Sequence, residues 1–116
     1  MTDVLDEAVL GELEAFGPEF LAELVDTFEG QAVELRAEID RALAAGEIEL
    51  AHRAAHTLKG SALSIGAAGA AAHAAAVDRA IGAGELEAAA RLTEPIPAAV
   101  TEALAALRAR IAGMPS

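Results

Sequence analysis

The chain contains no cysteine, tryptophan or tyrosine, and it has only three phenylalanines, at positions 16, 20 and 28. Without cysteine there is neither a disulfide framework nor a thiolate metal site, and the composition fits a reducing cytosol. The first seven residues are acidic and lack the basic and apolar regions of a signal peptide. We therefore expect a cytoplasmic protein.

The sequence also lacks a long run of large apolar residues. Residues 60–77 are uncharged, but their only large aliphatic residues are Leu63, Ile65 and Val77, and the rest is mainly alanine, glycine and serine. A transmembrane helix needs about 20 strongly apolar residues. We therefore expect no contact with a membrane.

Basic residues are few. Lysine and arginine number 8 against 19 acidic residues, which gives a net charge of −11, and residues 1–50 hold fourteen of the acids against Arg36 and Arg41. Such a surface repels phosphates, so nucleic acid is not an expected partner. Most of these acids are expected simply to solvate exposed helix faces.

The residues that are present favour helices. Hydrophobic residues make up 54% of the 116 positions and are mostly alanine and leucine, with few β-branched side chains. Alanine and leucine have high helix propensity, and this length suits one hydrophobic core. The sequence therefore predicts an all-α fold with residues 1–116 in a single domain.

Apolar residues spaced three and four apart mark the individual helices. The expected ranges are about 6–15, 18–45, 47–65 and 68–82, followed by a segment 85–112 that prolines divide near residues 93–97. Short glycine-marked turns between them imply antiparallel neighbours. We expect an antiparallel up-and-down four-helix bundle with a short extra N-terminal helix and a proline-interrupted last helix.

The third expected helix carries His56 on its polar side. At about 100° per residue, His56 lies about 140° from the apolar stripe of this helix, Lys59 about 80° and Gly60 about 180°. A helical glycine costs about 1 kcal/mol relative to alanine, which this chain uses freely. Gly60 therefore suggests that a partner approaches the imidazole closely.

The pattern favours a phosphorylatable histidine. An unperturbed imidazole titrates near pH 6.5 and is mostly neutral in the cytosol, and a lysine one turn away would attract phosphoryl oxygens. If the chain reverses at Gly66, the residue level with His56 lies near position 77. Asp78 could then accept a hydrogen bond from one ring nitrogen and leave the other as the nucleophile.

Other interpretations of these residues stay open. His56 could be a solvated surface histidine, and Asp78 could merely pair with Arg79 or with water. His52 and His56, spaced i, i+4 and accompanied by Glu49, could bind a metal, although two histidines form a weak site. His73 is expected to be a partly buried, hydrogen-bonded core residue. Ser61 and Ser64 lack the base of a hydrolase, and no glycine-rich phosphate loop indicates a nucleotide site.

At this point the chain resembles the histidine-containing phosphotransfer (HPt) domains. The resemblance rests on residues 56–62 (HTLKGSA), 66–67 (GA), 20–28 (FLAELVDTF) and 84–86 (GEL), and it covers essentially the whole chain. It implies that His56 is the phosphoacceptor, Lys59 a neighbouring cation and Gly60 the contact that permits docking. Asp78 falls where the family commonly has glutamate or glutamine.

The resemblance implies a carrier, not an enzyme. Its partners would be response-regulator receiver domains and a sensor or hybrid histidine kinase. It would need no cofactor or metal of its own, because Mg²⁺ is expected only on the partner receiver domain. We expect a stand-alone monomer that docks through an apolar patch beside His56, including Leu63 and residues of the second helix. The alternatives are a non-phosphorylatable module that docks receivers, and a metal-binding bundle enzyme.

Two departures from the family pattern bear on packing. Ala70 and His73 occupy positions that are usually larger and apolar, and Pro95 and Pro97 interrupt a last helix that is usually continuous. We expect these departures to alter local packing in the fourth and last helices and to leave the chemistry unchanged.

Overall fold

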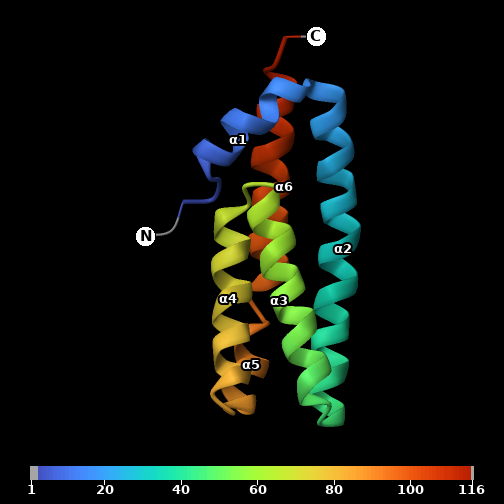
Figure 1. Ribbon diagram of the computed structural model, residues 1–116, viewed down its shortest axis with the longest axis vertical. Coiled ribbons are helices and arrows are strands. Elements are labelled where there is room, and N and C mark those ends of the chain that lie inside the picture. Colours follow the sequence, from blue (N-terminus) through green and yellow to red (C-terminus); the bar gives the residue numbers. More distant parts are fainter. Residues whose placement is uncertain (1–2, 116) are drawn as a thin grey trace.

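A computed structural model describes residues 3–115, which form helices joined by short turns (Figure 1). No strand occurs among these residues. The elements in chain order are α1 (Glu7–Leu13), the 3₁₀ turn η1 (Glu14–Phe16), α2 (Pro18–Ala45), α3 (Ile48–Ser64), α4 (Ala68–Gly82), α5 (Leu86–Leu92) and α6 (Ile96–Ala112).

The helix boundaries follow local backbone chemistry. Pro18 occupies the first turn of α2, where its missing N–H removes no helical hydrogen bond. Gly46 ends that helix in the left-handed conformation at φ 73°. The expected ranges 18–45 and 68–82 are confirmed, and the ends of the other helices differ from expectation by one or two residues.

Four helices form the bundle, and consecutive ones run in opposite directions (Figure 1). The contacts follow a ring, in which α2 packs on α3, α3 on α4, α4 on α6, and α6 back on α2, while α5 lies against α4. The expected all-α, antiparallel four-helix architecture is confirmed. Because α3 and α4 lie side by side and antiparallel, polar residues on their outer edges can meet.

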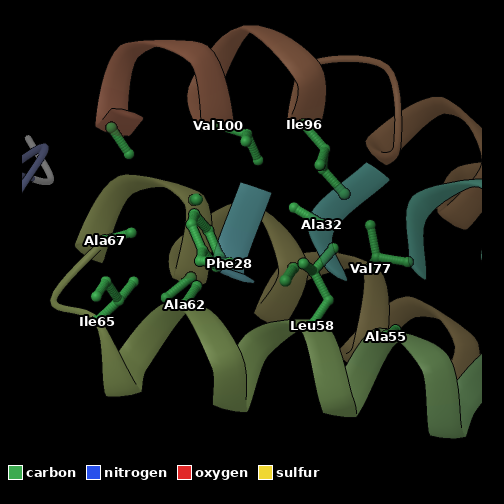
Figure 2. Packing of buried hydrophobic residues seen from close by; sticks show 14 of the residues in the cluster. Phe28, Ala32, Ala55, Leu58, Ala62, Ile65, Ala67, Val77, Ile96 and Val100 are labelled. Carbon is green, nitrogen blue, oxygen red and sulfur yellow. The ribbon is translucent and has the colours of Figure 1, made fainter. Parts of the chain in front are cut away.

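The core is built largely from small side chains. Alanine supplies half of the buried hydrophobic residues in the described chain, whereas Phe28 is the one phenylalanine among them. Figure 2 shows Phe28 and Leu58 lying between α3 and α6, with Ala32 and Ala62 around them. Alanine lets helices approach closely, so a few large residues are enough to fill the space between them.

The prolines divide the last helical segment as expected. Thr93 ends α5, is buried, and donates a hydrogen bond from its hydroxyl to the Ala90 carbonyl at 2.7 Å. Pro95 then precedes α6, whose first turn also contains Pro97. The buried Thr93 hydroxyl therefore has a hydrogen-bond partner, and the interruption between α5 and α6 does not leave this side chain unpaired in the core.

The N-terminal residues cover the turn between α3 and α4. The Asp6 N–H donates to the Gly66 carbonyl at 2.8 Å, the Gly69 N–H donates to the Val4 carbonyl at 3.2 Å, and Leu10 is fully buried. Small residues at the start of α4 leave room for this segment. Ala70, one of the two departures from the family pattern in this helix, is buried in the core.

Two arginines of α6 bind acidic residues from the N-terminal half. Arg110 pairs with Glu7 at 2.7 Å and with Glu14 at 2.9 Å, and Arg108 pairs with Glu29 at 2.8 Å and with Asp26 at 3.2 Å. The hydrogen bonds that they donate raise the pKa of both guanidinium groups, the bond to Glu14 being the largest cause for Arg110 and the bond to Glu29 for Arg108. These exposed pairs set where α6 meets α1 and α2 more than they stabilise the fold.

The Gly66 turn gives a test of this packing. Gly66 has φ +77°, and a Cβ there would lie 3.2 Å from Leu10 Cγ, whereas Gly46 has a similar φ and open space around it. We predict that Gly46→Ala lowers the free energy of unfolding by about 1 kcal/mol from backbone strain alone. Gly66→Ala should cost about 2 kcal/mol, because it also displaces Leu10. Urea denaturation measures both, and equal losses would show that the Leu10 contact is unimportant.

Candidate functional site

His56 lies on the outer side of α3. This helix buries Ala51, Ala55 and Leu58 in the core, and the His56 side chain on its other side is 67% exposed. The exposure agrees with the angle expected from helical spacing. A partner molecule can therefore reach the imidazole ring without any change in the bundle.

Asp78 of α4 lies directly beside this ring. Its Oδ2 is 3.2 Å from His56 Nδ1, and its side chain is only 13% exposed. An ionised carboxylate accepts hydrogen bonds and cannot donate them, so Nδ1 must carry the proton. The other ring nitrogen, Nε2, then has the free lone pair. The α3–α4 register thus gives His56 one donor nitrogen and one nucleophilic nitrogen.

Lys59 and Gly60 follow on the next turn of α3. Lys59 is half-buried, and within residues 3–115 it forms no ion pair with a carboxylate. Gly60 is exposed, and a Cβ built on it would meet nothing within 4 Å. The fold therefore gives no steric reason for glycine at position 60, and the lysine ammonium remains available to an incoming anion.

Comparison with known proteins identifies this arrangement. The sequence model of the Hpt domain matches residues 23–110, a range that holds His56, Lys59, Gly60 and Asp78. The chain belongs to the Hpt domain family. Its role is that of a phosphotransfer carrier in a phosphorelay, and its partners are of the kinase and receiver classes that make up two-component systems.

Solved structures share the Hpt fold. The histidine-containing phosphotransfer protein B of Pseudomonas aeruginosa PAO1 superposes with a TM-score of 0.84 at 24% identity, covering 97% of each chain. The histidine-containing phosphotransfer protein MtHPt2 of Medicago truncatula gives a TM-score of 0.75 at 23% identity, covering 97% of this chain and 85% of the other. Among curated protein sequences, none matches this chain. At these identities the structures establish the shared fold.

A second histidine reaches the Asp78 of this Hpt domain. His52 Nε2 lies 2.9 Å from Asp78 Oδ1, so both carboxylate oxygens have an imidazole neighbour. Sequence reasoning considered His52 only as a metal ligand and missed this contact. The signal was available, because an antiparallel register that sets position 56 level with 77 also sets 52 level with 81, and Asp78 falls between these two levels.

The metal-binding hypothesis gains no support from this arrangement. In the part of the chain that the structure describes, no group of three or more histidine and acidic residues is placed to hold a metal ion. Glu49 borders the same hollow as His52 and His56 but is not brought into a ligand set with them.

His73 lies away from the Hpt site. It is half-buried, as expected, in a hollow that Val4 of the N-terminal segment and Glu102 of α6 also line. No hydrogen bond links its ring to another residue between positions 3 and 115, so the expected hydrogen bond is not found. Ala71 belongs to the buried residues of α4, whereas His73 does not.

The exposed large apolar residues in the described part of the Hpt domain include a Phe16–Phe20 pair whose ring centroids lie 5.2 Å apart. Leu63, one turn beyond Gly60 on α3, is 49% exposed. In α2 the exposed large residues are Phe20 and Val33, but Val33 lines a groove against Ile96 of α6. Leu63 is therefore exposed on the helix that carries His56, whereas Val33 belongs to the side of α2 that faces α6.

The open space around Gly60 yields a stability prediction. We expect Gly60→Ala to raise the free energy of unfolding by about 0.5–1 kcal/mol, because alanine restricts the unfolded chain and clashes with nothing. Gly30→Ala is a matched control, since Gly30 is also an exposed glycine within a helix with open space around it. Thermal and urea denaturation measure both changes. A loss of stability in Gly60→Ala alone would show that the fold itself requires this glycine.

Proposed function

We propose that His56 is the residue on which this Hpt domain carries the phosphoryl group. The observation that supports this most is the exposed imidazole whose Nδ1 lies 3.2 Å from a half-buried carboxylate. That contact selects the tautomer with a free Nε2, which is the form able to attack phosphorus. The surrounding helix presents a lysine and a glycine on the turn where a partner would dock.

The transfer step follows from these groups. The His56 Nε2 lone pair forms the N–P bond, while the bond from phosphorus to the aspartyl oxygen of a phosphorylated receiver breaks and its electrons stay on the leaving carboxylate. Nδ1 keeps its proton, so the phosphorylated ring gains positive charge. The Asp78 carboxylate offsets that charge, and the Lys59 ammonium attracts the phosphoryl oxygens. The reverse step passes the group to a second receiver.

We also propose that the chain needs no nucleotide or metal of its own. Its sequence contains no glycine-rich phosphate loop, and Mg²⁺ is expected only in the receiver's acidic site. Acting as a single monomeric domain in the cytoplasm, it would meet receivers and a sensor or hybrid kinase by diffusion. The acidic surface disfavours nucleic acid. No helix within residues 3–115 is long and apolar enough to cross a bilayer.

Label transfer tests the assignment of His56. When the protein is mixed with a receiver phosphorylated with ³²P, we expect label on the wild type and none on His56→Gln. The glutamine variant should change the free energy of unfolding by less than about 0.5 kcal/mol, because position 56 is exposed. The label should be lost in acid and kept in base, as a phosphoramidate requires. Label on His56→Gln would reject the assignment.

The same mixture separates the carrier from an interaction module. A wild-type protein that binds the phosphorylated receiver but takes up no label would be a docking module without phosphoryl chemistry. Binding is measured by calorimetry on the same samples, so failure to dock and failure to transfer are distinguished.

Partner access at Gly60 gives a further prediction. Gly60→Gln should slow phosphotransfer about tenfold or more, because a long side chain displaces the receiver from its reactive geometry. The same change should leave the fold at least as stable, since glutamine favours helix more than glycine does. Stopped-flow transfer and urea denaturation measure the two effects. Unchanged transfer would show that no partner approaches position 60.

A further inference from the structure

The contact with His56 uses only one of the two carboxylate oxygens of Asp78, and the other oxygen, Oδ1, lacks a hydrogen-bond donor. Oδ2 lies beside His56, but Oδ1 is inaccessible to solvent and has no aligned hydrogen bond. A buried carboxylate oxygen without a donor is costly. The nearest group able to donate is His52 Nε2, at 2.9 Å. At this distance a small turn of the imidazole aligns its N–H with Oδ1.

No other residue of the described chain competes for this oxygen. The ion pairs of Asp78 between positions 3 and 115 are those with His52 and His56. Arg79, its neighbour in sequence, is exposed and does not pair with it. The His52 side chain is 50% exposed, so the ring has room to adjust.

Gly82 leaves the space that His52 occupies. It lies one turn after Asp78 on α4, and a Cβ built on it would be 3.9 Å from His52 Nε2. Gly82 and Ile81 border the hollow between α3 and α4 that also contains His52 and His56. A Cβ at this distance would make ordinary van der Waals contact, so the His52 ring lies against α4 at this position. The approach of His52 is therefore built into both helices.

We propose that His52 is a positioning residue, which holds Asp78 through Oδ1 so that Oδ2 stays directed at Nδ1 of His56. The proposal rests on the function proposed for His56. Torsion of a carboxylate about its last bond is broad and has no sharp minimum, so a single hydrogen bond leaves the group free to turn. One imidazole bound to each of the two oxygens would fix the plane of the carboxylate. The tautomer of His56, and hence its nucleophilic Nε2, then depends on His52.

The tautomer can be measured without a partner or a phosphoryl group. Nitrogen-15 shifts of the imidazole rings, recorded at a pH where they are neutral, give the ratio of the two His56 tautomers. We expect the wild type to favour Nδ1–H strongly. In His52→Ala the ratio should fall about three- to tenfold, the effect of one hydrogen bond. His52→Gln should restore most of the ratio, because its amide N–H can donate to Oδ1.

Two controls separate this effect from a loss of structure. His73→Ala removes a histidine from another face and should leave the His56 ratio unchanged. In an Asp78→Ala background, His52→Ala should have no further effect, because the two residues act through one carboxylate. Stopped-flow transfer from a phosphorylated receiver should slow by less than the tautomer ratio falls, because a strongly favoured Nδ1–H form stays in the majority.

The results that would overturn the role of His52 differ from those that would reject His56 as the phosphoacceptor. An unchanged ratio in His52→Ala, a failure of glutamine to restore it, or an equal change in His73→Ala overturns the proposal. Each of these results leaves the phosphoacceptor assignment intact, since that assignment is decided by label on the wild type and on His56→Gln. Loss of label transfer with a His52-dependent tautomer would reject the phosphoacceptor role alone.

Discussion

The contact between Asp78 and His56 across α3 and α4 is the interaction on which the proposed chemistry of this protein depends. It exists because the chain reverses at Gly66, with a backbone that only glycine adopts easily, and because the two helices then run side by side (Figure 1). The carboxylate is half-buried while the imidazole is exposed. The site therefore combines a fixed proton position on one ring nitrogen with open access to the other.

The packing beneath the site serves this arrangement. Alanines form much of the core, so α3 and α4 lie close enough for short aspartate and histidine side chains to meet. The N-terminal segment covers the turn at Gly66, where Leu10 is fully buried. Gly60 differs from Gly66 in this respect, because nothing in the fold surrounds it. The backbone needs glycine at position 66, whereas at position 60 the proposed reason is the approach of a partner.

Charge is distributed in a way that matches a carrier. The acidic residues of the N-terminal half are mostly solvated or paired with arginines of α6. The basic residue beside the histidine, Lys59, is the only lysine in the chain. In the proposed function this ammonium attracts the phosphoryl oxygens locally, without making a largely acidic protein attractive to polyanions. The imidazole of His52, a second ionisable group, lies beside the other oxygen of Asp78.

The sequence by itself determined the helices and the exposed position of His56, because helical period and glycine and proline breaks are local properties. It made Asp78 one candidate neighbour of that ring through the antiparallel register of two successive helices. Tertiary structure alone decided three further points. The approach of His52 to Asp78 depends on how two rings share one carboxylate in space. The surroundings of His73 include Val4, which is distant in sequence. The side on which Val33 is exposed depends on the path of α6 after its prolines. These contacts join residues that are far apart along the chain, so the helical spacing of apolar residues does not predict them.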